Sequence, residues 1–538
     1  MRQLIVSLFV LLAMVARSQG ANVIDTDICI YGGTSGGVIA AIQAAHMGKS
    51  VSFTVFDKNL GGMTTGGLSS TDKGNMKSIG GLAKEFYDRV GKYYGKAETF
   101  NFEPHVARSV FEAWLSEAGI KPRFNQRLAS VVQDQKRIKE ITMEDGTVYR
   151  AKMFIDASYE GDLMAKAGVS FTVGREGTNV YGESLNGVRA RTPNHQFSAK
   201  VDPYVTPGKP ESGLLPFVQP GNSSAPGEAD QRLQAYNYRL CFTQNATNKL
   251  PILVPKDYNP ERYELLGRLI DAKLAIGHSL SLRSFFNPKT LPNGKLDLNN
   301  NGPFSTDFIG VNYKYPTDTY VDRARAKDET LAYTQGLVYY LANSSRSPAS
   351  LRAEIQSWGP CKDEWPENGG YSTEIYVREA RRMVGDYIMT QANCLGARIA
   401  KDSVCLGSYN MDTHNCQRLV QDGLVRNEGD VQMGVPRPYP IAYRAIVPRA
   451  TECKNLLVTF AISASHIGFG SIRMEPVLMM ISQSAATAAA IAIDGNTPVQ
   501  EVQYEKLALK LASDSQILSW GSVKKISKET TDSPLIAH

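Results

Sequence analysis

The sequence predicts an α/β protein in which a doubly wound domain, built on a parallel sheet, carries an inserted α+β domain. A strand, a glycine-rich turn, a helix and a second strand follow one another from residue 27 to residue 57. A further strand and a long Ala-rich helix lie near the other end of the chain, between residues 456 and 493. The segment from 170 to 320 differs in kind, because it is rich in Pro, Gly, Asn and aromatic residues and has only short periodic stretches.

Length and composition exclude several classes of protein. A chain of 538 residues can form more than one domain, each with its own core. Its 42% hydrophobic and 21% charged residues argue against a disordered chain, a collagen-like repeat or a membrane bundle. The formal charge of +6 is small for this length, and no run of Lys and Arg could follow a phosphate backbone. We therefore expect no nucleic-acid partner.

The N-terminus has the pattern of a secretory signal peptide. Arg2 precedes the apolar run Leu4–Val15, and small residues follow at Ser18–Ala21. The run is too short for a helix that crosses a bilayer, and no later segment is expected to reach that length. We therefore expect residues 1–20 to be cleaved from a secreted or periplasmic protein that has no membrane span in its mature form.

The first strand, turn, helix and strand are expected at Asp27–Tyr31, Gly32–Gly37, Val38–Met47 and Val51–Phe56. This order is typical of a dinucleotide-binding βαβ unit, in which the turn and the helix N-terminus hold a pyrophosphate.

Three glycines and a threonine carry the expected function of the turn. Gly32 and Gly33 permit a tight bend, and Gly37 lets the helix pack closely on the strand. Thr34 stands where the usual motif has its second glycine, so the backbone approaches the pyrophosphate with a side chain present, whose hydroxyl could donate to phosphate. Asp57 ends the second strand, 25 residues after Gly32, where an acid can bind the ribose hydroxyls.

The rest of the chain reads as alternating helical and extended segments. We expect helical structure at 82–120, 263–275, 328–342, 373–391 and 476–493, and strands at 128–132, 138–143, 148–154 and 456–460. The expected divisions are a first part of the nucleotide-binding domain at 22–165, a substrate-side domain and helical region at 166–440, the C-terminal part of the first domain at 441–500 and a tail at 501–538.

Four motifs together resemble the FAD-dependent oxidoreductases with a glutathione-reductase-like fold, and more closely a secreted subgroup distantly similar to the heterodisulfide reductase flavoprotein subunit. They are the turn Gly32–Gly37, Leu60–Thr64, Ile155–Asp162 and Ser465–Pro476. The resemblance implies a Rossmann-like FAD-binding domain and FAD as cofactor. It implies cofactor contacts at Gly61, Gly62, Met63 and Asp156, at Val131 or Val132 for the adenine, and at Ile467, Arg473 and Glu475 beneath the isoalloxazine ring.

Catalytic candidates come from polar residues near the expected flavin. His466 is the first, as a base that takes a substrate proton, although a buried structural histidine is the alternative. Asp412 and His414 are the second. Arg378, with Arg381 and Arg382, could bind an anionic substrate from one helix face, or could instead form surface salt bridges with Glu374 and Glu379.

The seven cysteines do not have the spacing of a zinc or iron–sulfur site, so no metal is expected. Cys29 lies in a predicted buried strand and is read as a core thiol. One or two disulfides are expected among the cysteines of the C-terminal region, which are Cys361, Cys394, Cys405, Cys416 and Cys453.

The function expected from these features is hydride transfer between a small polar substrate, with carbohydrates among the candidates, and FAD. The electron acceptor is left open. Two alternatives remain: a secreted carbohydrate-active lyase or hydrolase that uses Asp412 and His414, and a non-catalytic binding protein that keeps the flavin fold.

Overall fold

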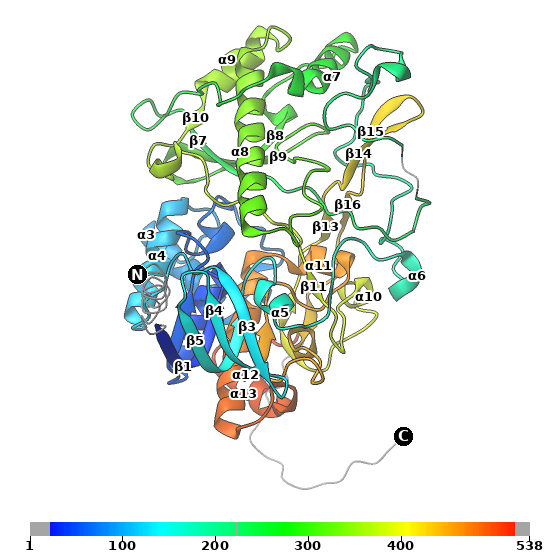
Figure 1. The fold of residues 1–538 in the computed structure, drawn as a ribbon. Helices are drawn as coiled ribbons and strands as arrows, with labels where there is room; N and C mark the ends of the chain where they lie inside the picture. The colour runs from blue at the N-terminus through cyan, green and yellow to red at the C-terminus, as the bar shows by residue number, and fades with distance from the viewer. Residues whose placement is uncertain (1–21, 222–223, 522–538) are drawn as a thin grey trace, which may run out of the picture.

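The computed structural model describes residues 22–221 and 224–521. The predicted signal peptide, and residues 522–538 of the predicted tail, lie outside the described residues. In Figure 1 the chain forms two lobes, with both ends of the chain contributing to the lower one.

The lower lobe is built on a six-stranded sheet that joins segments from the two ends of the chain. Its strands are β1 (Val23–Tyr31), β2 (Val51–Thr54), β3 (Leu128–Asp134), β4 (Arg137–Met143), β5 (Val148–Asp156) and β18 (Leu456–Val458). The order is β2-β1-β5-β4-β3, and β18 also pairs with β5. Strands β2, β1, β5 and β18 are parallel, whereas β3 and β4 are antiparallel to their neighbours. The predicted α/β class with a parallel sheet is confirmed.

Two layers cover this sheet. Helices α2 (Ser35–His46), α3 (Gly81–Tyr93), α4 (Pro104–Glu117) and α12 (Glu475–Gly495) share one hydrophobic core with the inward residues of β1, such as Ile28 and Ile30. The alternate residues Cys29 and Tyr31 face a second core, which includes side chains of β3 and β4 and of α5 (Asp162–Lys166). On this face the core is thus closed by the short helix α5 and by side chains of the β3–β4 end of the same sheet, and not by a second layer of long helices.

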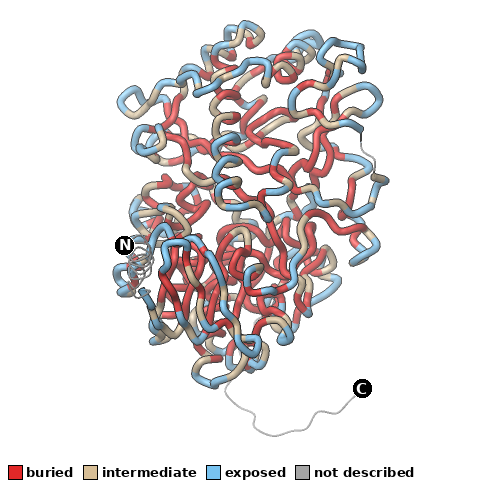
Figure 2. The backbone as a smooth tube through the Cα atoms, in the orientation of Figure 1, coloured by how far each residue is buried: buried red, intermediate tan, exposed pale blue. Residues whose placement is uncertain are grey.

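The upper lobe has an antiparallel sheet and a core of its own. Strands β7 (Leu240–Thr243), β8 (Phe286–Thr290), β9 (Lys295–Asn300) and β10 (Gly359–Pro360) pair in the order β10-β7-β9-β8. Helices α7 (Glu264–Ala275), α8 (Tyr320–Asn343) and α9 (Ala349–Ser357) pack with this sheet. In Figure 2 buried segments fill the interior of both lobes, and exposed backbone follows their outer loops.

The rest of the described chain forms short elements that are distributed over both lobes. The two-stranded pairs are β6 (Phe171–Thr172) with β11 (Arg382–Met383), β12 (Ser403–Gly407) with β17 (Tyr439–Ala442), β13 (Met411–Thr413) with β16 (Val431–Met433), and β14 (Gln417–Gln421) with β15 (Leu424–Glu428). The remaining α-helices of the described residues are α6 (Thr178–Tyr181), α10 (Gln391–Cys394), α11 (His466–Ile472) and α13 (Tyr504–Ser513). Helix α13 buries Leu507 and Leu511, so part of the predicted tail is packed structure.

The prediction of a helix over 373–391 is wrong. This stretch is extended, and Arg382 pairs with Thr172 in a short antiparallel ladder. Its arginines are neither on a helix face nor at the surface, because Arg378 and Arg382 are fully buried. Each guanidinium reaches a different carboxylate: Arg378 pairs with Asp307, Arg381 with Asp162, and Arg382 with Glu176 and Glu379. The four-residue spacing of Arg378 and Arg382 is therefore not that of a helix face, because each arginine has carboxylate partners of its own.

Helix α12 differs from the expectation that no segment after the leader reaches membrane-spanning length. Within the described ranges it is long and apolar enough to cross a membrane, but 89% of its most apolar window is buried inside the fold. Its apolar composition is accounted for by the core, where it packs against α2 and α3.

The predicted disulfides among the C-terminal cysteines are not formed in this structure. All seven cysteines are free and buried. Cys29, read as a core thiol, lies in the sheet core as expected.

Candidate nucleotide pocket and polar cluster

A pocket of about 460 Å³ lies where the parallel strands end, between the two lobes. In open α/β sheets, ligands bind at this edge, beyond the carboxyl ends of the parallel strands. Of the predicted cofactor residues, Gly32, Gly33, Thr34, Asp57 and Gly62 line it. The opposite wall comes from the upper lobe, and its residues on α8 are Tyr320, Arg323, Ala324, Lys327, Asp328 and Leu331.

The glycines of the turn are required by close contacts of the backbone. Gly32 has a φ of +119°, and a Cβ there would lie 2.5 Å from the Ala157 carbonyl carbon. At Gly37 a Cβ would lie 2.0 Å from the Gly32 carbonyl oxygen. A side chain at either position would push the helix away from the strand end, which is the close packing that the sequence predicted for Gly37.

Thr34 caps helix α2. Its Oγ1 accepts a hydrogen bond from the Gly37 amide at 3.1 Å and donates to the Ala157 carbonyl at 2.8 Å. The hydroxyl hydrogen is therefore directed to protein, and the prediction that it donates to phosphate is not met in this structure. Ser35 and Gly36 open helix α2, so their amides have no partner within the helix, and the parallel bridge of Thr34 with Gly61 directs the Ser35 amide toward the Gly61 carbonyl.

Asp57 follows β2 at the mouth of the pocket, as expected, but it faces a lysine that the sequence did not single out. Lys327 Nζ of α8 lies 3.8 Å from Asp57 and 3.7 Å from Glu374. Burial, together with the charge of Asp57, raises the pKa of Glu374 to about 7, although Lys327 opposes the shift. Asp57 and Glu374 thus share the ammonium group of Lys327, which belongs to the upper lobe.

The C-terminal segment meets the glycine-rich turn directly. Glu475, at the start of α12, accepts hydrogen bonds from Ser35 Oγ at 2.5 Å, Thr64 Oγ1 at 2.8 Å and the Tyr159 hydroxyl at 2.8 Å. Burial raises the pKa of this carboxyl. The expected proximity of the segment Ile467–Glu475 to the turn after Tyr31 is confirmed at Glu475.

Tyr159 links this carboxylate to the second glycine motif. Its hydroxyl accepts from the Met63 amide at 2.8 Å. A Cβ at Gly62 would lie 2.5 Å from the same hydroxyl, and both Gly61 and Gly62 have positive φ. The Gly61–Met63 backbone therefore lies against Tyr159. Because Tyr159 and Ser35 both donate to Glu475, this carboxylate joins the second glycine motif to the first turn of α2.

Two predicted cofactor contacts lie away from the pocket lining. Val131 and Val132 lie in β3 outside the lining, whereas Asn125 and Arg127, just before that strand, belong to it. The adenine contact at Val131 or Val132 stays a prediction. Asp156 ends β5 and is buried, where its carboxylate accepts from the Ser158 and Met164 amides. It shapes the turn beneath Gly32 without lining the pocket.

Three of the four catalytic candidates and Arg473 come together in one polar cluster. His414 Nδ1 lies 2.7 Å from Asp307, and Arg378 pairs with Asp307 at 2.9 Å. His414 Nε2 lies 4.0 Å from Asp412, which pairs with Arg473 at 3.2 Å. We call these five residues the His414 cluster.

The His414 cluster is close to the Gly61–Met63 loop. Arg473 donates to the Tyr376 hydroxyl at 2.7 Å, and Tyr376 packs with Met63 and Leu68. A chain of contacts thus runs from the pocket, through the second glycine motif, to the catalytic candidates.

The pKa values of Asp307 and His414 are both lowered, so that one residue is a charged acceptor and the other a neutral base. Burial opposes ionisation of Asp307, but Arg378 and His414 outweigh it and lower its pKa to about 2. Burial and Arg378 lower the pKa of His414, although Asp307 opposes this. His414 is therefore neutral at pH 7 and can accept a proton, while Asp307 is ionised and orients the ring.

His466 lies in a different network and matches the structural alternative. Its amide donates to Glu176 at 2.9 Å, and its Nδ1 lies 2.7 Å from Glu379. Arg382 bridges the same two glutamates. Burial and the charge of Arg382 lower the pKa of His466 to about 3. Ile467 beside it is fully buried in the core.

The depressed pKa of His466 predicts a loss of stability in acid. Between its ordinary 6.5 and about 3, the unfolded chain binds a proton that the folded chain does not. The free energy of unfolding therefore falls with falling pH, by about 1.4 kcal/mol per unit from this residue. Urea unfolding of wild type and His466→Gln between pH 7 and 5 should show a shallower decline in the variant. Parallel declines would contradict the assignment.

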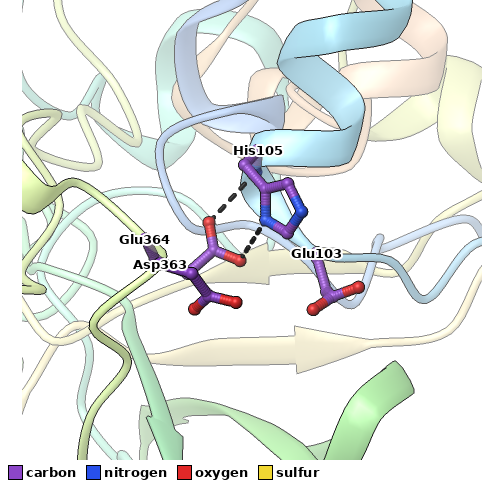
Figure 3. Close-up of side chains that lie close together, drawn as sticks. All are labelled: Glu103, His105, Asp363 and Glu364. Carbon is purple, nitrogen blue, oxygen red and sulfur yellow. Dashed lines mark hydrogen bonds and ion pairs between the residues drawn. The ribbon is translucent and has the colours of Figure 1, made fainter. Parts of the chain in front are cut away.

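A second group of ionisable residues, drawn in Figure 3, brings the start of α4 together with the chain that follows β10. Ligand atoms of Glu103, His105, Asp363 and Glu364 lie within 4.8 Å of one another, as in a metal site. Lys295 Nζ, however, binds three of the carboxylates, at 2.7 Å from Glu103 and Asp363 and 2.8 Å from Glu364. Its ammonium neutralises the charge that a cation would bind, so this group is an ion-pair network.

Comparisons with known proteins add the following. A family model described as "FAD dependent oxidoreductase" matches residues 27–511. No curated protein matches the chain. Partial likenesses exist to solved structures. Thioredoxin reductase from T. acidophilum has 19% identity and a TM-score of 0.17, over 31% of this chain and 39% of that one. Flavin-containing monooxygenase from Stenotrophomonas maltophilia has 14% identity and a TM-score of 0.20, over 29% and 43%. The chain thus spans less than half the length of either structure.

Proposed function

Since this chain belongs to the family of FAD-dependent oxidoreductases, we propose that the pocket at Gly32–Thr34 holds the ADP half of its FAD and that the His414 cluster acts on the substrate. The observation that carries the proposal is the contact of Glu475 with Ser35, because it joins the far end of the chain to the nucleotide turn. The same carboxylate reaches Tyr159 and Thr64, next to the second glycine motif.

The residues of the pocket fit FAD. The first-turn amides of α2, that of Gly36 above all, are donors for a pyrophosphate, and the positive end of the α2 dipole favours its charge. The missing side chains at Gly32, Gly33 and Gly62 leave the backbone of the pocket bare. Asp57 offers a carboxylate to the ribose hydroxyls, and Lys327 faces it from α8.

The His414 cluster supports work on a polar substrate. Within the cluster, Arg378 Nε and Arg473 Nε are buried and have no hydrogen-bond partner within the described ranges. Because an unpaired buried polar atom is costly, a substrate with hydroxyl or carboxylate groups would gain by pairing with them. We propose a small polar substrate, with carbohydrates as the first class to test.

The division of labour follows from the geometry. FAD, when bound in this pocket, would supply two-electron oxidation chemistry for the substrate. Neutral His414, held by Asp307, takes the proton from the substrate hydroxyl. Arg473 and Arg378 hold polar groups of the substrate, and the hydrophobic contact of Tyr376 with Met63 keeps the cluster beside the glycine loop. We propose further that the protein is exported by its N-terminal leader and passes its electrons to an acceptor outside the cell's cytosol.

Anaerobic mixing of the flavin-loaded protein with sugars, sugar acids and other small hydroxy compounds tests this proposal. At least one of these should bleach the visible flavin absorption, and the product should be two hydrogens lighter than the substrate. A product with a new carbon–carbon double bond in an acidic polysaccharide, formed without bleaching, would instead support the lyase alternative.

Asp57→Ala should weaken FAD binding by about tenfold to 100-fold, because a hydrogen bond to a charged group is worth about 1.5–3 kcal/mol. Binding of FMN, which has no adenosine ribose, should not change. Quenching of flavin fluorescence measures both constants. Asp494→Ala is a matched control, since Asp494 is an exposed acid at the end of α12. Equal losses for FAD and FMN would contradict a ribose contact.

A further inference from the structure

Two buried cysteines face each other in the upper lobe. Cys241 is on β7, and Cys361 directly follows β10. The register pairs Gly359 with Thr243 and Pro360 with Phe242, and so continues to Cys361 opposite Cys241. The Cys361 amide donates to the Cys241 carbonyl at 3.1 Å, and the two sulfurs are 3.7 Å apart.

The backbone at this pair suits a disulfide. In a hydrogen-bonded antiparallel pair the Cα atoms are about 5.5 Å apart, which is near the usual separation in disulfides. The sulfurs need to approach to about 2.05 Å. Rotation about the Cα–Cβ bonds can supply this movement. Elsewhere in the described chain no two cysteine sulfurs are in contact, so of the five cysteines that spacing had suggested only Cys361 has a partner, and that partner, Cys241, lies outside the five.

We propose that Cys241 and Cys361 form a disulfide when the protein is made in an oxidising compartment. Each thiol loses its hydrogen, the two sulfurs bond, and two electrons and two protons pass to a disulfide oxidant such as oxidised glutathione, which becomes two thiols. The proposal depends on export and is independent of the flavin chemistry.

The bond would anchor a segment that contributes both to the ion-pair network of Lys295 and to the nucleotide pocket. From Cys361 the chain continues through Asp363 and Glu364, which bind Lys295, to Thr373 and Glu374 in the wall of the nucleotide pocket. A cross-link between residues 120 apart restricts the unfolded chain strongly. The disulfide therefore stabilises the upper lobe and holds the start of this pocket wall against β7.

Thiol counting on wild-type protein is the direct test. Protein secreted through its own leader into a bacterial periplasm is denatured, its free thiols are alkylated, and its mass is measured before and after reduction. Five of the seven cysteines should be alkylated before reduction. A digest without reductant should contain one linked pair of peptides, those with Cys241 and Cys361. Seven alkylated cysteines, or a linked pair without these two, would overturn the proposal.

Matched variants separate the bond from general effects of losing a buried thiol. In Cys241→Ser and in Cys361→Ser all six remaining cysteines should be alkylated before reduction. In Cys394→Ser, which changes another buried thiol, only four of the six should be alkylated, because Cys241 and Cys361 stay bonded to each other. Dithiothreitol should lower the unfolding temperature of wild type and of Cys394→Ser, and leave that of Cys361→Ser unchanged. If either serine variant fails to fold, the peptide map of wild type still decides the question.

Discussion

Gly37→Ala is expected to bind FAD at least about 100-fold more weakly than wild type, a loss of about 2.7 kcal/mol or more. The new Cβ would lie 2.0 Å from the Gly32 carbonyl oxygen, which is backbone and cannot rotate away. The N-terminus of α2 has to move, and with it the first-turn amides that would donate to the pyrophosphate. Titration of the apoprotein with FAD, followed by flavin fluorescence, measures the loss.

The control is the same substitution on another helix. A Cβ at Gly495, near the end of α12, would meet Thr497 only at an ordinary distance of 3.6 Å. Gly495→Ala should therefore bind FAD as wild type does. Circular dichroism shows whether Gly37→Ala is folded. A folded Gly37→Ala protein with unchanged FAD affinity would remove the turn from the cofactor site.

His414→Gln should reduce its flavin about 10² to 10⁴ times more slowly than wild type, which is the usual contribution of a general base. Its FAD content should be unchanged, because His414 contacts Asp307 and not the nucleotide pocket. In wild type the rate of flavin reduction should fall as pH drops through the lowered pKa of His414, since only the neutral ring accepts a proton. Stopped-flow absorption with the bleaching substrate measures this rate across pH.

The control for this variant is His278→Gln, which changes an exposed histidine after α7. It should keep the wild-type rate and pH profile. His466→Gln should mainly alter stability, as its buried network indicates. A His414→Gln protein that reduces flavin at the wild-type rate would exclude the ring as the base and would leave the cluster with a role in binding alone.

Much of the lower lobe could be predicted from the sequence because local rules govern it. The strand, glycine turn, helix and strand from residue 27 to 57 follow from hydrophobic periodicity and from backbone contacts that only glycine permits. The approach of Glu475 to Ser35 is not local, and it was predicted only through the resemblance of the segment Ser465–Pro476 to a known family.

The site residues that the sequence missed depend on contacts across the lobes. Lys327 is one of many polar residues on a long helix, and only the fold places it opposite Asp57. Tyr159 was quoted within a motif, but its bond to Glu475 has no sequence signal. Arg378–Arg382 resembled a charged helix face because buried arginines with separate partners have the same spacing. A charged side chain in a core is recognised only when its partner is known.

The most direct test of the central claim is the FAD content of purified wild type, Glu475→Ala and Glu505→Ala, the last being an exposed acid on α13. Released flavin is quantified against protein after denaturation. Wild type and Glu505→Ala should carry one FAD per chain, and Glu475→Ala should have lost most of it, because Ser35, Thr64 and Tyr159 lose their common partner. A folded Glu475→Ala protein with full FAD, or a wild-type protein that neither contains nor binds FAD, would contradict a cofactor seat made by the two ends of the chain.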